Sequence, residues 1–349
     1  MTPALIGVLV GVLVGFFVRR ARLCSFGAIE SALIGRDWRR MKVFGLALGL
    51  AMGLTAAFTF IGWFDPGRTP YAVTRLPWLG IGIGAVMFGF GMALVGTCAF
   101  GSLIRLGGGD LRSLMTLLIF GGTAFAVLRG ALAGARIDYV ERVTVLIPDG
   151  RAALLTAMTH TGPLLALALG VSLVGLALID RRLWKAPKLL TAGVMLGLGV
   201  AAGWLVTGMI HDEFAGIQRV QSLTFVAPVA RALFGLAMGG PGWVDFGVAS
   251  VFAVPVGAFL AARLARDFHW EAYDDPREMR RHIVGAVLMG AGGILAGGCT
   301  IGQGITAGSI TAASWFIAVP GMILGARLGI LFLVEDSFFA GILSRLRKE

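Results

Sequence analysis

Long apolar runs alternate with short polar segments along the whole chain. A helix needs about 20 mostly apolar residues to cross the hydrocarbon core of a bilayer, so the pattern predicts nine membrane-spanning helices. They lie near residues 3–18, 43–61, 78–96, 113–133, 160–180, 189–209, 244–266, 282–298 and 311–333. The first run leads into Arg19 and Arg20 without a small-residue cleavage site, so we interpret it as a span and not as a removed signal peptide.

Four glycine-rich stretches between the predicted spans are too short to cross a bilayer. They are 22–35, 97–110, 213–239 and 299–310. We interpret them as re-entrant elements that enter the membrane and leave on the same side. Irregular backbone at membrane depth is tolerated only where protein or a water-filled cavity satisfies its polar groups. Four such elements therefore predict a lined central path.

The composition agrees with a membrane protein and excludes an ordinary soluble or disordered chain. Of the 349 residues, 57% are hydrophobic and only 14% are charged, and the mean hydropathy is +0.86. A soluble domain has about 25% charged residues. The net charge of +11 could suggest a nucleic-acid partner, but the basic residues lie between apolar runs, as membrane topology requires. We therefore expect lipid and not nucleic acid around this chain.

Basic residues gather on one side of the predicted topology. If 36–42 is cytoplasmic, nine spans place 19–22, 181–188, 263–281 and 345–348 on the same side with Arg105 and Arg112, which accounts for 21 of the 30 Lys and Arg residues. Cytoplasmic loops carry such an excess of positive charge. The N-terminus is then expected outside and the C-terminus in the cytoplasm.

The order of spans and short elements repeats in the two halves of the chain. The predicted fold is an all-α integral membrane protein with a single domain over 1–349, with repeats at about 1–133 and 189–333 and a lone linking span at about 160–180. Each half has four spans, so the lone span inverts the second half relative to the first. Inverted repeats with broken helices are typical of transporters, whose binding site lies at the repeat interface.

Three cysteines stand at the starts of predicted re-entrant elements: Cys24, Cys98 and Cys299. Cys98 and Cys299 occupy equivalent places in the two repeats, because a similar glycine-rich run precedes each of them. The fourth equivalent place falls at Thr224 and has no thiol. An odd number of cysteines does not suggest a disulfide framework. A lone membrane cysteine is usually packing, but three at matching positions favour a functional role.

A helix N-terminus offers unpaired N–H groups and a partial positive charge, which together favour an anion. A thiol adds a weak S–H donor and a soft, polarizable sulfur, so we expect a sulfur-containing anion as the substrate. The candidate path is Cys24, Cys98 and Cys299. The candidate substrate-binding residues around the path are Gly96, Thr97, Gly297, Gly298, Thr300, Gln303, Arg22, Arg105 and Glu30. The alternatives are that Arg22 and Arg105 are topology signals, that Glu30 forms a structural ion pair and that Gln303 packs between helices.

The motifs around the cysteines resemble the YeeE/YedE family of sulfur-transport membrane proteins over essentially the whole chain. The matching runs are Gly96-Thr97-Cys98-Ala99-Phe100-Gly101-Ser102 and Gly297-Gly298-Cys299-Thr300-Ile301-Gly302, with Arg22-Leu23-Cys24 upstream. Thr97 stands where the family often has glycine. The resemblance implies an inner-membrane permease for thiosulfate, which passes along the three cysteines through S–H hydrogen bonds. It also implies that any TusA-type sulfur carrier is a separate cytoplasmic protein.

The predicted function is therefore uptake of thiosulfate, without catalysis, a cofactor or a metal. The four histidines have no metal-ligand spacing among themselves or with the cysteines. The alternative is a sulfur relay, in which one cysteine becomes a persulfide and hands sulfur to a cytoplasmic carrier. A relay needs a low-pKa thiol beside a base, and no His or Lys adjoins a cysteine in the sequence.

Overall fold

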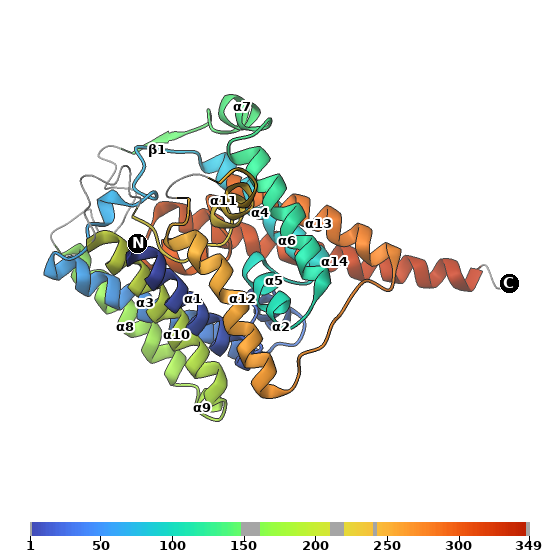
Figure 1. The fold of residues 1–349 in the computed structure, drawn as a ribbon, viewed down its shortest axis with the longest axis horizontal. Coiled ribbons are helices and arrows are strands. Elements are labelled where there is room, and N and C mark those ends of the chain that lie inside the picture. The colour runs from blue at the N-terminus through green and yellow to red at the C-terminus, as the bar shows by residue number, and fades with distance from the viewer. Residues whose placement is uncertain (1, 148–160, 210–219, 240–242, 347–349) are drawn as a thin grey trace.

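The computed structural model describes residues 2–147, 161–209, 220–239 and 243–346. Helices form most of this part of the chain (Figure 1). The long helices are α1 (Thr2–Ala21), α3 (Arg39–Ile61), α4 (Trp78–Val95), α6 (Leu111–Leu128), α8 (Gly162–Leu178), α10 (Pro187–Met209), α12 (Phe246–Ala265), α13 (Pro276–Leu295) and α14 (Ala313–Leu346).

Shorter elements lie between the long helices. They are α2 (Ser25–Leu33), η1 (Pro66–Arg68), β1 (Arg75–Leu76), α5 (Ala99–Gly107), α7 (Ala133–Ala135), η2 (Arg136–Val140), β2 (Val145–Leu146), α9 (Arg181–Trp184), α11 (Ala227–Met238) and η5 (Gly302–Ala307). Three predicted re-entrant stretches thus contain the short elements α2, α5 and η5. The fourth contains α11, and its residues 213–219 lie outside the described part.

The predicted all-α membrane class is confirmed. Seven helical stretches are long and apolar enough to cross a bilayer: Pro3–Leu33, Arg39–Ile61, Trp78–Gly107, Leu111–Leu128, Pro187–Met209, Phe246–Ala265 and Ala313–Val334. The two other predicted spans also coincide with helices. However, α8 has only 17 residues, and α13 begins with the charged segment from Arg277 to Arg281, so neither meets the same criterion.

Glycines let the long helices approach one another closely. A Cβ at Gly15 of α1 would lie 2.2 Å from the carbonyl oxygen of Val254 in α12, and a Cβ at Gly89 of α4 would lie 2.1 Å from that of Met322 in α14. In a bilayer the lipid chains are as apolar as the side chains, so dispersion contacts between helices drive their packing. Small residues strengthen these contacts because they let the two backbones approach closely. Substitution of either glycine would therefore separate two helices.

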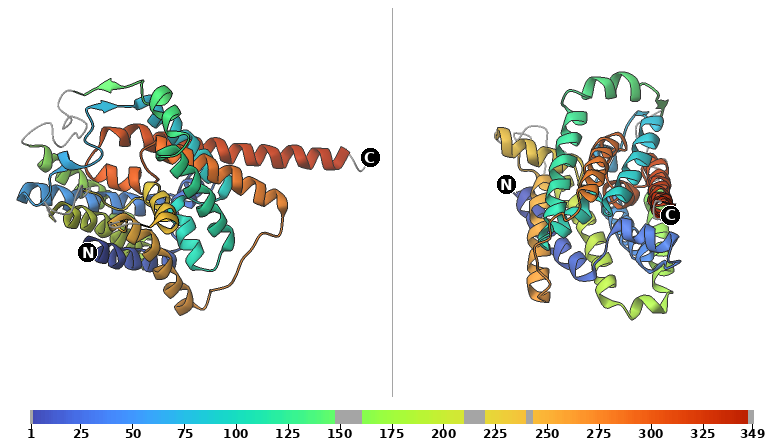
Figure 2. Two further views of the ribbon diagram at one scale, coloured as in Figure 1. Left: turned by 45° about the horizontal axis from the view of Figure 1, so that its top comes forward. Right: turned by 90° about the vertical axis from the view of Figure 1, so that its right-hand side faces the viewer.

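The long helices pack in pairs that are distant in the sequence. Helix α1 packs on α12 and α10 on α3, while α4 packs on α14 and α6 on α13. Among the short elements, α5 contacts α12 and α6, and η5 contacts α3 and α14. Figure 2 shows the C-terminal part of α14 extending beyond the other helices.

Loops that the sequence predicts on the same side of the membrane also contact each other in the structure. The predicted outer segments 62–77 and 129–151 meet where β1 pairs with β2. The predicted inner segments meet through ion pairs, because Lys42 binds Asp180 at 2.6 Å and Arg112 binds both Glu271 and Glu278. These contacts join loops that are distant in the sequence.

Candidate functional site

Cys98 caps the start of α5. Helix α4 ends at Val95, and its C-cap Gly96 has a φ of +73° that reverses the chain, as glycine readily allows. Cys98 is then extended, and its Sγ accepts the backbone N–H of Gly101 at 3.3 Å. The side chain is fully buried. A sulfur lone pair thus satisfies one orphan N–H of the helix, and the S–H proton stays available for another acceptor.

Cys299 stands in a similar turn after α13. Gly297 has a φ of +73°, as Gly96 has, and Gly298 follows with a φ of +158°. The Sγ of Cys299 accepts the backbone N–H of Gly302 at 3.3 Å, and the residue is fully buried. The segment that follows is the π-helix η5 and not an α-helix. Each of the two thiols therefore accepts the backbone N–H of the third residue after it.

Cys24 lies beside Cys98 although the two belong to different helices. Cys24 is the N-cap of α2, and its Sγ lies 3.5 Å from Oγ1 of Thr97. The Cys24 and Cys98 side chains are close enough to interact. A Cβ at Gly101 would lie 3.2 Å from Sγ of Cys24 and 3.6 Å from Sγ of Cys98. The first turns of α2 and α5 thus hold two thiols together.

Thr224 lies beside the turn at Cys299, and Cys24 lies in a similar place beside the turn at Cys98. The Thr224 side chain lies near the Cys299 thiol, and a Cβ at Gly302 would lie 2.4 Å from Oγ1 of Thr224. Gly302 is the glycine whose N–H binds Cys299, just as the N–H of Gly101 binds Cys98. Thr224 therefore places a polar side chain beside the Cys299 turn.

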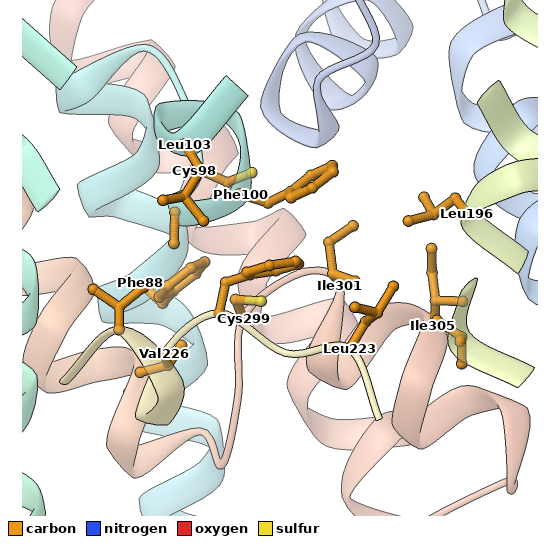
Figure 3. Packing of buried hydrophobic residues seen from close by; sticks show 14 of the residues in the cluster. Phe88, Cys98, Phe100, Leu103, Leu196, Leu223, Val226, Cys299, Ile301 and Ile305 are labelled. Atoms are coloured by element: carbon orange, nitrogen blue, oxygen red, sulfur yellow. The ribbon is translucent and has the colours of Figure 1, made fainter. Parts of the chain in front are cut away.

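Apolar side chains and one hydroxyl pair lie around the two thiol groups. Phe100 and Phe225 stack with ring centroids 4.8 Å apart, and Figure 3 shows Cys98 and Cys299 within the same buried cluster. Ser25 Oγ lies 2.8 Å from Thr300 Oγ1, next in sequence to Cys24 and Cys299 respectively. The Ser25 side chain also lies near Cys98. Neutral donors in an apolar surrounding bind an anion more strongly than they would in water.

The other residues singled out near the thiols have specific partners. Thr97 is buried and contacts Cys24, and Thr300 contacts Ser25. Gln303 is buried as well, and its Nε2 donates to the carbonyl of Ala296 at 2.8 Å while its Oε1 accepts from Ser314 at 3.2 Å. Gln303 therefore fixes the turn before Cys299.

The charged candidates lie at the edge of this cluster. Arg105 is exposed, and its guanidinium donates to the carbonyl of Gly96 at 3.2 Å. Arg22 is exposed too and lies 3.6 Å from Asp267. Glu30 is exposed on α2. Arg105 is close enough to Cys24 for a Coulombic interaction, whereas Arg22 and Glu30 have no contact with a thiol among the described residues.

Two further residues reach the site from segments that carry no sequence motif. A Cβ at Gly27 would lie 3.2 Å from Nη1 of Arg40 and 3.7 Å from Cβ of Cys24, so the Arg40 guanidinium lies beside the first turn of α2. Tyr71 donates its hydroxyl to the carbonyl of Gly302 at 3.1 Å. Arg40 belongs to a basic segment that indicates topology, and Tyr71 lies in a loop, so neither stands out in the sequence.

Within the described residues, no group of three or more His, Cys, Asp or Glu side chains could hold a metal ion. His269 instead binds two groups in its own connection, the carbonyl of Asp267 at 3.0 Å and the carboxylate of Glu271 at 2.5 Å. These two acceptors raise the pKa of His269 above its usual value. This connection packs against the α5–α6 turn through Gly109.

Seven long apolar helices with short helical elements between them define the class of a multi-pass membrane protein. The chain belongs to the Sulphur transport family, whose model matches residues 20–328. It is 28% identical over 342 residues to the thiosulfate transporter TsuA of Escherichia coli (strain K12), with 91% of each chain covered. It is 25% identical over 339 residues to the thiosulfate transporter TsuA of Spirochaeta thermophila (strain ATCC 700085 / DSM 6578 / Z-1203), with 91% of this chain and 96% of that protein covered.

Proposed function

We propose that this protein is a permease for thiosulfate uptake and that the anion passes along Cys299, Cys98 and Cys24. The observation that carries the proposal is that Cys98 and Cys299 each accept a backbone N–H at the start of a short helical element. A thiol held in this way directs its S–H toward another acceptor. The negatively charged oxygens and the terminal sulfur of thiosulfate are such acceptors. The relatives named as thiosulfate transporters support this substrate.

A path made of weak donors suits conduction. An ion must bind well enough to enter each position and weakly enough to leave it. S–H is a weaker donor than O–H or a charged amine, and the Ser25–Thr300 hydroxyl pair lies between the two thiol groups. The anion would pass from one set of donors to the next without meeting a fixed charge in the apolar core.

The proposed architecture is nine crossing helices with two inverted repeats, about 1–133 and 189–333, around the linking span at 160–180. The helix contacts support it. In the proposed repeat, α1, α3, α4 and α6 of the first half correspond in order to α10, α12, α13 and α14 of the second. The contact of α1 with α12 then corresponds to that of α10 with α3, and the contact of α4 with α14 to that of α13 with α6. All four contacts exist. The short elements α2 and α5 exchange in the same way with α11 and η5.

In this architecture the N-terminus is periplasmic and the C-terminus cytoplasmic. Cys299 then lies toward the periplasm, near Tyr71 of the outer segment, and Cys24 and Cys98 lie toward the cytoplasm. Arg40 and Arg105 would draw the anion to the inner end, since fixed positive charge raises the local concentration of an anion. A separate TusA-type carrier protein would receive the anion or its sulfur there.

The second candidate function is a sulfur relay through a cysteine persulfide. It needs a thiolate with a nearby base. Among the described residues, the hydrogen-bond partners of the three thiols are the Thr97 hydroxyl and the backbone N–H groups of Gly101 and Gly302, and none is a His or Lys side chain. This surrounding favours passage of the intact ion over chemistry on it.

One experiment separates the two functions. Proteoliposomes with the purified protein take up thiosulfate that carries a different isotope label on each sulfur, and the protein is then analysed by mass spectrometry. A permease delivers both labels in equal amounts and leaves all three cysteines unmodified. A relay delivers one label and adds a sulfur atom, about 32 Da, to one of the cysteines. Uptake of sulfate at the same rate as thiosulfate would contradict both.

A further inference from the structure

A groove of about 240 Å³ opens between α3 and α14. Its floor consists of α2 and η5, because each of these elements contacts both long helices. Most of its walls are apolar side chains, namely Met41, Phe44 and Leu48 of α3 and Trp315, Val319 and Ile323 of α14. The polar atoms of its floor include the hydroxyls of Ser25 and Thr300.

The groove is closed at one end and continues as an exposed apolar strip at the other. A Cβ at Gly308 would lie 2.7 Å from both Leu48 Cδ1 and Trp315 Nε1, so the walls converge there. At the opposite end, Leu33 follows Ile29 of the floor by one turn, and Trp38 precedes Met41 by one turn. Residues four apart within one helix lie on the same face, as Ile29 and Leu33 do in α2, and Trp38 directly precedes α3. Leu33 and Trp38 are 41% and 55% exposed.

The open end also carries positive charge. Arg36 is exposed in the connection between α2 and α3, and its side chain forms no ion pair within the part of the chain that the structure describes. An exposed tryptophan beside a basic residue is typical of the membrane interface. Basic residues at this level attract the headgroups of anionic lipids.

We propose that this groove binds one phospholipid of the surrounding bilayer, with a fatty-acyl chain between α3 and α14 and an anionic headgroup at Arg36. Both walls belong to helices that are apolar enough to cross a membrane, so hydrocarbon chains are the molecules that lie against them. An acyl chain in the groove makes dispersion contacts with the side chains of its walls, which lack these contacts when the groove is empty. It also covers the Ser25–Thr300 pair from the membrane side. The inference concerns lipid and holds whichever anion the protein transports.

Photolabelling of the full chain in vesicles tests this assignment. The vesicles contain phosphatidylglycerol with a diazirine in one acyl chain, and adducts are located by peptide mass spectrometry after irradiation. We expect labelling of Met41–Leu48 and Trp315–Ile323 to exceed severalfold that of Leu118 and Leu260, which are exposed on other long helices. Labelling of the groove at or below that of these two positions would overturn the proposal.

A pair of glycine substitutions, one inside the groove and one outside it, supplies a test and its matched control. A Cβ at Gly45 meets no atom within 4 Å and opens into the groove, and a Cβ at Gly122 of α6 also meets none but lies outside it. Gly45→Leu should lower the groove adducts severalfold and leave those at Leu260 unchanged, whereas Gly122→Leu should change neither. Unchanged groove adducts in Gly45→Leu would show that no chain occupies the groove.

The headgroup is tested with the same acyl chain on phosphatidylcholine, which has no net charge. Groove labelling should be severalfold weaker with this lipid, and Arg36→Gln should weaken the labelling by phosphatidylglycerol to the same level. Equal labelling by the two lipids in the wild-type protein would overturn the assignment of an anionic headgroup.

Discussion

The hydroxyl groups of Ser25 and Thr300 lie 2.8 Å apart, although 275 positions separate the two residues in the chain. Ser25 follows Cys24 at the start of α2, and Thr300 follows Cys299 before η5. Each hydroxyl can donate and accept, so the pair joins the Cys24–Cys98 group to the Cys299 turn. The residues that follow Cys24 and Cys299 thereby bring the two thiol-bearing turns into contact.

Replacement of Cys98 or Cys299 by alanine should lower the kcat/KM of thiosulfate uptake about tenfold or more. A hydrogen bond to a charged group contributes about 1.5–3 kcal/mol, and about 1.4 kcal/mol corresponds to a factor of ten. Cys24→Ala should also impair uptake. Labelled thiosulfate in proteoliposomes measures the effect, and size-exclusion chromatography checks the fold. Wild-type uptake by the folded Cys98→Ala protein would show that this thiol only fills space.

Alanine at Gly101 or Gly302 should reduce uptake without unfolding the protein. The new Cβ would lie 2.2 Å from Thr97 Oγ1 in the first case and 2.4 Å from Thr224 Oγ1 in the second, so the polar side chains beside the thiols would have to move. Gly122→Ala is the matched control, because its Cβ meets no atom within 4 Å. Equal uptake by all three variants would contradict the importance of this geometry.

Arg40→Gln should lower kcat/KM severalfold and weaken its dependence on ionic strength, because a fixed charge near the path attracts the anion. Arg40→Lys keeps the charge and should retain most of the activity. Arg39→Gln removes the same charge from the neighbouring position, where Arg39 is exposed and paired with Asp37, and serves as the control. Identical kinetics of the Arg40→Gln and Arg39→Gln proteins would exclude a role for Arg40.

The two chain ends should lie on opposite sides of the membrane, with the C-terminus in the cytoplasm. The expectation rests on the position of 21 of the 30 basic residues and on the odd number of predicted spans. Reporter fusions at Met1 and after Glu349, one active in the periplasm and one in the cytoplasm, measure it. Termini on the same side would remove the inverted repeat.

His269 should titrate above the ordinary histidine pKa of about 6.5, because the carbonyl of Asp267 and the carboxylate of Glu271 raise its pKa. The folded state thus favours the protonated ring. Its contribution to stability is present below the unfolded pKa and is lost as pH rises through the folded pKa. NMR of the histidine ring measures the midpoint, which should fall in Glu271→Gln. An unchanged midpoint would show that Glu271 has no such effect.

The sequence by itself determined the membrane class and the local geometry of the thiols. Apolar runs of membrane length leave few alternatives to helices, because each backbone polar group must be satisfied within its own segment. The turn at Cys98 is equally local, since a glycine with positive φ, a capping side chain and an N–H three residues later all lie within Gly96–Gly101. The family motifs mark the same residues.

Tertiary structure alone decided which groups meet. The contacts of Cys24 with Thr97, of Thr224 with Cys299 and of Ser25 with Thr300 join segments 73 or more positions apart. Hydropathy predicts that a helix crosses the membrane, but it does not predict which helix packs against it. The choice depends on close packing at glycines such as Gly15 and Gly89. The approach of Arg40 to the first turn of α2 depends on that packing in the same way, because the energy that selects helix neighbours comes from many small contacts across the whole core.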